Sequence, residues 1–181
     1  MPSTPAPRIV SIASSLHQTA SSSIKFLSLD EINDSSLGAN ALYARSKLAV
    51  ILYIRFGLVE KVIKPNKDNI FAIATHPGNV HTDQQDQFKE AFGNVAGTAL
   101  KYAVIPMMRN PDQGSLSTLW AATSPVVEEK NLQGVYVQDP GNWGGETKQA
   151  QDQELGNNLW KLSHDLIESK LGKDALVDWN A

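Results

Sequence analysis

Short apolar blocks separated by polar turns run along this chain and predict strands. Residues 9–13 are mostly β-branched and apolar and precede a polar stretch, which predicts a buried strand ending in a loop. Residues 70–76 form a second continuous apolar block, and Pro77 and Gly78 break it sharply, so we predict a second strand there. Residues 134–138 predict a third strand.

Helical patterns lie between and after these strands. Residues 41–62 follow Asn40, a candidate N-terminal cap, and stop before Pro65, which forbids continuation of a helix. This helix is apolar around much of its girth, so we expect it to be covered by the sheet and by a second helix or another subunit. Another helix is predicted before Pro125, and a further one in the C-terminal tail, where apolar residues recur every three or four positions.

The order of these elements predicts the fold class. A strand, a helix and a parallel strand form a βαβ unit, whose crossover is right-handed. The predicted class is therefore α/β. The sequence has no internal repeat and no linker, so residues 1–181 are predicted to form one domain that begins with an extended lead-in over residues 1–8.

Two segments have less regular patterns. Residues 16–40 are polar and predict a loop with a small hairpin. Residues 84–110 contain good helix formers with weak periodicity. Two interpretations fit this segment equally well, and both stay open. One is a substrate lid with an apolar underside, and the other is a pair of surface helices packed on the core.

Composition narrows the range of functions. The 181 residues include 16 basic and 19 acidic ones, a formal charge of −3, with no dense Lys/Arg block, so nucleic acid is not an expected partner. The longest apolar run, residues 48–54, is far shorter than the ~20 residues that cross a bilayer, so no membrane span is expected. The absence of cysteine excludes disulfides and thiol catalysis and fits a cytoplasmic protein.

A candidate acid/base pair lies near the start of the 41–62 helix. Tyr43 and Lys47 are four residues apart and share one helix face, so the phenol and the ammonium can act on the same small volume. A free phenol holds its proton up to pH ~10, and a fixed positive charge beside it favours the phenolate in a partly desolvated site. The same spacing is common on ordinary amphipathic helices, so the pattern alone is weak evidence for catalysis.

Hydroxyl and imidazole groups stand at the ends of the predicted strands. Ser14 follows the first strand, at the edge of the sheet where open α/β folds bind ligands, so its hydroxyl is placed to bond a substrate. The alternative is a loop serine that caps local backbone groups. His76 and His81 are five residues apart across Pro77 and Gly78, which is not the spacing of helical metal ligands, so no metal site is predicted.

Three motifs occur together in this order. They are Arg-Ile-Val-Ser-Ile-Ala-Ser at 8–14, Tyr-Ala-Arg-Ser-Lys at 43–47 and His-Pro-Gly-Asn-Val-His-Thr at 76–82. Together they resemble the C-terminal half of the short-chain dehydrogenase/reductase family, and residues 114–134 look like its retinol-dehydrogenase-like branch. The resemblance implies a Rossmann-like, doubly wound parallel sheet that is incomplete, with the last three strands and their helices.

The resemblance also implies catalytic roles. Ser14 would hydrogen-bond the substrate carbonyl, with Ser15 as the alternative because the doubled serine leaves the register uncertain by one. Tyr43 would donate or accept the proton. Lys47 would favour the Tyr43 phenolate and bind the nicotinamide ribose, so this pair would contact the cofactor as well.

A nicotinamide cofactor follows from the same resemblance: NADP or NAD, with a slight preference for NADP. It would carry the hydride while the protein supplies orientation and the proton. Val80 and Thr82 would contact the nicotinamide carboxamide, and Pro77 and Gly78 would shape the loop that permits this. The implied activity is reduction of a carbonyl or oxidation of an alcohol on a small, hydrophobic substrate.

The family's glycine-rich N-terminal half has no counterpart in this sequence, and only seven residues precede Arg8. We therefore expect a truncated chain whose 9–13 strand is an exposed edge and whose cofactor binding is weak or undetectable on its own. The alternative is a catalytically inactive, family-derived protein with a binding or regulatory role. The broad apolar 41–62 helix also permits a homodimer.

Overall fold

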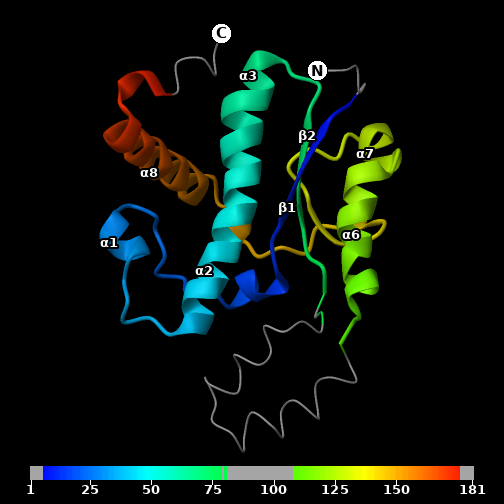
Figure 1. The fold of residues 1–181 in the computed structure, drawn as a ribbon, viewed down its shortest axis with the longest axis horizontal. Helices are drawn as coiled ribbons and strands as arrows, with labels where there is room; N and C mark the ends of the chain where they lie inside the picture. Colours follow the sequence, from blue (N-terminus) through cyan, green and yellow to red (C-terminus); the bar gives the residue numbers. More distant parts are fainter. Residues whose placement is uncertain (1–5, 79, 81–107, 176–181) are drawn as a thin grey trace, which may run out of the picture.

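A four-stranded sheet runs through the protein. The computed structural model describes residues 6–78, 80 and 108–175, and the strands lie in the order β1-β2-β3-β4 (Figure 1). The first three are mutually parallel and β4 is antiparallel to β3, which confirms the predicted α/β class and the neighbouring order of the three predicted strands. The fourth strand was not predicted, because two residues carry no periodic pattern. The bounds are Arg8–Ile12 for β1, Phe71–Thr75 for β2, Tyr136–Asp139 for β3 and Asn142–Trp143 for β4.

Strand β2 is buried over all five residues because it lies between two strands and is covered on both faces. Its side chains alternate between two hydrophobic clusters, as the period of a strand requires. Ala72 and Ala74 face one cluster, and Phe71 and Ile73 face the other. The parallel ladder continues past β1, where the Ala13 amide donates to the Thr75 carbonyl at 2.7 Å. The polar residues that follow β1 and β2 are thereby brought to one end of the sheet.

The predicted 41–62 helix is longer than expected at both ends. It begins with α2, Ala39–Leu52, capped by Gly38, and continues through the π-helix η2, Tyr53–Ile63, into α3, Lys64–Asn66. The prediction of Asn40 as the cap is wrong, because Asn40 already lies in the first turn. The prediction that Pro65 forbids continuation is wrong by one turn. A new hydrogen-bond register begins at Lys64, and proline is tolerated in the first turn of a helical segment, where its missing N–H breaks no bond.

Helices cover both faces of the sheet (Figure 1). The α2–η2–α3 helix lies on one face, and α6, Pro111–Thr123, with α7, Val126–Glu129, lies on the other. The C-terminal helix α8, Gln153–Leu171, packs against η2, so the long apolar helix is covered by the sheet and by a second helix, as expected.

Residues 16–40 do not form the predicted hairpin. This segment contains the short helix α1, Leu29–Ile32, and nearly all of the 3-10 helix η1, Ser15–Thr19. Elsewhere in the chain, a second 3-10 helix, η5, spans Gln149–Gln151. The Glu31 carboxylate accepts the amides of residues 25–27 at 2.8 to 3.1 Å, which folds this segment back on itself instead of pairing it as strands. Burial raises the pKa of the Glu31 carboxyl, but these three hydrogen bonds outweigh burial and hold it below its usual range.

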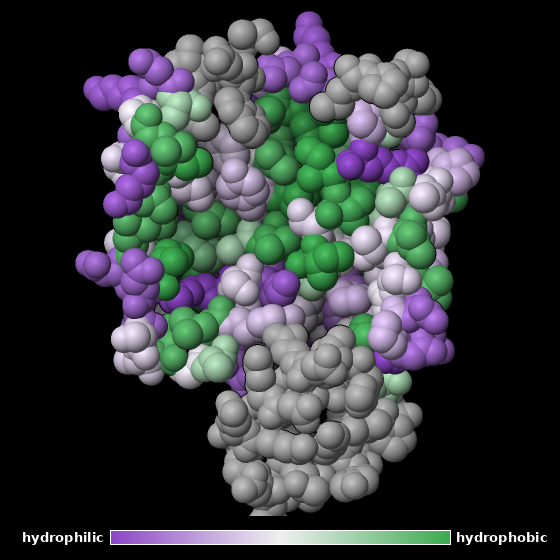
Figure 2. Space-filling model, in the orientation of Figure 1, coloured by the Kyte–Doolittle hydropathy of each residue, from purple (hydrophilic) through white to green (hydrophobic). Residues whose placement is uncertain are grey.

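Strand β1 forms an edge of the sheet, as predicted. Within the described residues no strand pairs with its outer side, and Ile9 and Ile12 are 39% and 43% exposed. Figure 2 shows hydrophobic side chains gathered on the face that carries η2 and β1. An apolar edge with free backbone groups is suited to pairing with another strand.

Other predictions fall outside the described part of the chain. Residues 84–107 are not described, so the lid and surface-helix interpretations of 84–110 both stay predictions, as does the single-domain interpretation. Across residues 6–78, 80 and 108–175, no helix combines the length and apolar character needed to span a membrane.

Candidate active site at the carboxyl ends of two parallel strands

Tyr43 and Lys47 lie side by side on α2, next to the end of β1. The Lys47 Nζ atom is 5.4 Å from the centroid of the Tyr43 ring. The same ammonium donates a hydrogen bond of 3.0 Å to the carbonyl of Ile12, the last residue of β1. Helix periodicity predicted that the two side chains share a face, and the structure adds that this face meets the strand end. Both side chains are half-buried.

Ser14 lies two residues beyond Ile12 and is 8% exposed. Its Oγ atom accepts the Leu16 amide at 3.2 Å and so caps η1. This is the capping role that the sequence offered as the alternative to substrate binding. The two roles are compatible, because a hydroxyl that accepts one bond still has its own hydrogen to donate. Among the described residues, no acceptor for that hydrogen is recorded.

The loop after β2 is shaped by a glycine and an arginine. Gly78 has φ +84°, and a Cβ atom there would lie 2.7 Å from Arg109 Cδ, so only glycine fits without displacement. Val80 forms a parallel bridge with Arg109, and a Cβ on Gly114 would meet Val80 Cγ2 at 2.4 Å. The backbone of this loop is thus held against the start of α6. Pro77 is half-buried in the same loop, and the predicted cofactor residue Thr82 lies outside the described residues.

A histidine joins the two predicted segments. The Ser15 amide donates to His76 Nδ1 at 3.2 Å, and the His76 backbone amide donates to the Val137 carbonyl at 2.8 Å. The Ser117 hydroxyl donates to the His76 carbonyl at 2.8 Å. Residues after β1 and after β2 therefore form one continuous site at the carboxyl ends of the strands, with α6 on its far side.

Sequence reasoning missed His17, which is wholly buried beneath Ser14. His17 Nδ1 lies 2.7 Å from the Ser14 carbonyl oxygen, and His17 Nε2 accepts the Thr147 amide at 3.3 Å. The ring also meets Tyr136 edge-on, with centroids 5.1 Å apart. A lone histidine in a polar loop gives no signal of this role, since Thr147 is 130 residues away in the sequence.

Burial sets the charge state of both histidines. It lowers the pKa of His17, opposed by the bond to Ser14 and by the Glu146 carboxylate. It also lowers the pKa of His76, aided by the Arg109 guanidinium and opposed by Asp139. Arg109 and Asp139 form an ion pair of 2.6 Å beside this loop. Both imidazoles are therefore neutral at neutral pH.

Two buried polar atoms near His17 have no hydrogen-bond partner within the described residues, namely Tyr136 Oη and Glu146 Oε2. Burial, together with the negative charge of Glu146, raises the pKa of the Tyr136 phenol, which keeps it protonated. The other Glu146 oxygen, Oε1, pairs with Arg55 Nη2 at 2.5 Å. This buried pair ties the loop after β4 to the π-helical segment η2.

The chain is similar in sequence to named oxidoreductases. It is 33% identical over 90% of its length to bli-4 of Neurospora crassa, a mitochondrial protein whose name assigns it provisionally to the oxidoreductases. It is 27% identical over 86% of its length to a human polyprenol dehydrogenase, and 28% over 94% to the short-chain dehydrogenase/reductase drtF of Aspergillus calidoustus. The chain spans 39%, 43% and 52% of the lengths of these three relatives, respectively.

Structural similarity supports the fold. The structure matches the crystal structure of an uncharacterized protein from Mycobacterium paratuberculosis with a TM-score of 0.59 and 23% sequence identity. The match covers 90% of this chain and 51% of the other. No protein-family model matches the chain.

Proposed function

Because the chain belongs, over the segment it spans, to the short-chain dehydrogenase/reductase family, we propose that it carries the proton-transfer half of an NAD(P)-dependent oxidoreductase site. The proposed reaction is reduction of a carbonyl or oxidation of an alcohol. One observation carries the proposal: Lys47 contacts both the Tyr43 ring and the last carbonyl of β1. The Tyr43 ring and the strand end that leads into Ser14 thus share Lys47 as a neighbour, which supports the proposal.

Each proposed role follows from the chemistry of the side chain. The Ser14 hydroxyl would donate to the substrate oxygen, since its hydrogen is not used in capping η1. In the reducing direction Tyr43 would give its proton to that oxygen, and in the oxidising direction it would take it. The Lys47 ammonium beside the ring would stabilise the phenolate that remains. NAD(P), when bound, supplies or accepts the hydride.

The described residues fit the nicotinamide end of such a cofactor. Gly78 presents backbone without a side chain at the end of β2, and Pro77 and Val80 flank it in a loop fixed by Arg109. Lys47, whose ammonium bonds the Ile12 carbonyl at this strand end, would bind the ribose hydroxyls. Thr82 is proposed to join them. No glycine-rich turn at a helix N-terminus lies within residues 6–78, 80 and 108–175, so the pyrophosphate has no cradle there.

The substrate is proposed to be a small, hydrophobic carbonyl or alcohol. One relative of the chain is named for a polyprenol, an apolar alcohol, which supports this class. A second candidate function is an inactive binding or regulatory protein that uses the apolar edge of β1, and the exposure of Ile9 and Ile12 favours it. The homodimer through residues 41–62 stays a prediction.

The test is a titration of the purified protein with NADPH and NADH, followed by nicotinamide fluorescence. Because the pyrophosphate has no cradle among the described residues, we expect weak binding of one or both cofactors, and we expect it to weaken further, at least ~10-fold, in Lys47→Ala, because a charge-assisted ribose contact is removed. Tyr43→Phe should keep binding and lose turnover by a factor of ~10²–10⁴. Lys64→Ala is the matched control, since Lys64 pairs with Glu60 on the exposed far end of the same helix. Absence of binding by the wild type at millimolar cofactor would leave the non-catalytic function.

A further inference from the structure

The Ser14–Ser15 segment, called here the serine turn, is the start of the 3-10 helix η1. The first amides of any helix lack partners within the helix and must find them elsewhere. Here the Leu16 amide is bonded by Ser14 Oγ, and the Ser15 amide is bonded by the His76 ring. An imidazole from another strand therefore completes the cap of this helix.

His17 holds the serine turn from the opposite side. The Ser14 carbonyl accepts two bonds, from the His17 amide at 3.2 Å and from the His17 ring nitrogen Nδ1 at 2.7 Å. The other ring nitrogen accepts the Thr147 amide, so the ring links the turn to the loop after β4. The serine turn is thus bonded by one imidazole at its carbonyl and by another at its amide.

These partners fix the tautomer of each ring. A backbone amide can only donate and a carbonyl can only accept. His17 must therefore carry its proton on Nδ1 and leave Nε2 free to accept from Thr147. His76 must leave Nδ1 free to accept from Ser15, which places its proton on Nε2. A protonated imidazole has two donors and no acceptor, so charging either ring breaks one of these bonds.

We propose that His17 and His76 are positioning residues that hold the serine turn, and with it the Ser14 hydroxyl, in place: neutral His76 bonds the Ser15 amide directly, and neutral His17 links the Ser14 carbonyl to the loop that carries Thr147. The part concerning the Ser14 hydroxyl rests on the proposed function, whereas the hold on the turn does not. The Ser15 amide donates the bond to His76, so the NMR resonance of this amide reports directly on whether that bond is formed.

Charged and titratable groups around the two rings oppose one another. His76 faces Arg109 and Asp139, which form an ion pair with each other, and it also faces His17. His17 faces the Glu146 carboxylate, which is shared with Arg55, and the edge of Tyr136. Charging one imidazole disfavours charging the other, so we expect the two bonds to break in separate steps as the pH falls.

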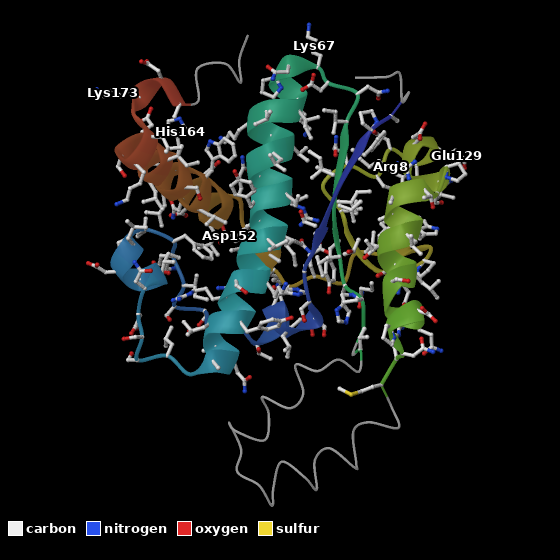
Figure 3. The ribbon with its side chains drawn as sticks, viewed as in Figure 1. Arg8, Lys67, Glu129, Asp152, His164 and Lys173 are labelled. Carbon is white, nitrogen blue, oxygen red and sulfur yellow. The ribbon has the colours of Figure 1, made fainter. Side chains whose placement is uncertain are left out.

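The first test is NMR of the ¹⁵N-labelled full chain. At pH 7.5 we expect the ring of His17 as the Nδ1–H tautomer and that of His76 as the Nε2–H tautomer. As the pH is lowered, the Ser15 amide resonance should shift with the same midpoint as the His76 ring. His164 is the internal control, because it lies on α8 beside Glu168, well away from β1 and β2 (Figure 3). The proposal would be overturned if His76 were the Nδ1–H tautomer, or if the Ser15 amide resonance did not shift as the His76 ring titrates.

Variants of His76 separate the hydrogen bond from the bulk of the ring. In His76→Asn the amide oxygen can replace Nδ1 as acceptor, so the Ser15 amide should stay protected and lose its pH dependence. In His76→Leu the acceptor is gone, and hydrogen exchange at Ser15 should accelerate at least ~10-fold. Equal exchange in the two variants would show that the ring acts only through packing. His164→Gln should change neither reading.

If turnover is found, the pH dependence of kcat gives a further test, because a role of His76 in packing alone would not change the acid side of that pH profile, called here the acid limb. The wild type should lose kcat on the acid side with the midpoint of His76, and His76→Asn should lack that acid limb. If the wild type binds no cofactor and shows no turnover, the proposed function fails, and the tautomers and the Ser15 titration still decide the positioning role. If turnover is present but has the same acid limb in His76→Asn, the positioning role fails and the function stands.

Discussion

Two regions of this protein are held together by different kinds of contact. The glycine junction consists of Phe56 and Gly57 on η2 and Gly156 and Trp160 on α8. The serine turn is held by His17 and His76. In the junction, a Cβ on Gly156 would lie 2.4 Å from Phe56 Cβ, and one on Gly57 would lie 2.7 Å from the Trp160 ring. In the turn, Ser14 and Ser15 are held by hydrogen bonds of 2.7 to 3.2 Å.

Because the contacts differ, the two regions should respond to different perturbations. The junction depends on shape, because glycine lets two helices approach until rings fill the space that a side chain would take. Its stability should respond to volume and not to pH. The serine turn depends on donors and acceptors that include two titratable rings. Its integrity should respond to pH and to polar substitutions, and much less to volume.

The largest effect is expected from Gly156→Ala. The nearest obstacle is the Cβ atom of Phe56, which no rotamer change can move away. Because that atom cannot move away, we expect an overpacking cost in the upper part of the ordinary range, about 2–3 kcal/mol. Alanine gains ~1 kcal/mol over glycine inside a helix, so the expected net loss is about 1–2 kcal/mol. Urea unfolding at pH 7.5 and pH 5.5 measures it. Gly38→Ala is the matched control, since nothing lies within 4 Å of its added methyl. A larger shift in Gly38→Ala than in Gly156→Ala would break the comparison.

A smaller effect is expected from pH on the wild type. The pKa values of His17 and His76 lie below the ordinary value of 6.5 in the folded state because burial disfavours the charged rings. The unfolded chain therefore binds more protons than the folded chain as the pH falls below about 6.5, so stability is full above that pH and declines beneath it. Urea midpoints between pH 8 and pH 5 measure the decline. It should be weaker in His76→Asn and unchanged in Gly156→Ala. If stability declines with the same slope in His76→Asn as in the wild type, His76 does not contribute to the pH dependence.

The smallest effect is expected from a region that belongs to neither class. Lys161 and Asp165 form an ion pair of 2.5 Å on α8, but their side chains are 76% and 54% exposed. Solvent and salt screen such a pair, so Lys161→Ala should change the free energy of unfolding by less than ~0.5 kcal/mol. The same urea experiment measures it and sets the baseline for the other two. A change in the free energy of unfolding as large as that of Gly156→Ala would mean that this exposed ion pair contributes to stability as much as the glycine junction does.

Much of the site was predictable where its signal is local. Tyr43 and Lys47 share a helix face by spacing alone, and the contact between Lys47 and the Tyr43 ring agrees with this. Pro77 and Gly78 mark the end of a strand because proline cannot donate a hydrogen bond to the ladder and glycine weakens a strand. The positive φ of Gly78 then follows from a turn that glycine enters without strain.

Other features could not be predicted because they join distant parts of the chain. The bond from Thr147 to His17 spans 130 residues, and the bond from Ser15 to His76 spans 61. A polar loop with one histidine looks the same in the sequence whether that ring is exposed or wholly buried. The change to π-helical turns at Tyr53 is of the same kind, since α-helical and π-helical residues have the same apolar pattern.

Local sequence patterns were enough to predict three of the four strands, the long apolar helix, the Tyr-x-x-x-Lys pair and the breaks after β1 and β2. These depend on the backbone preferences and side-chain periodicity of neighbouring residues, which the order of amino acids states directly. Only the folded structure shows which imidazole bonds which end of the serine turn, and that Gly156 faces Phe56. Such contacts are set by close packing between separate elements, where a displacement of one ångström makes or breaks a bond, and no local pattern encodes that distance.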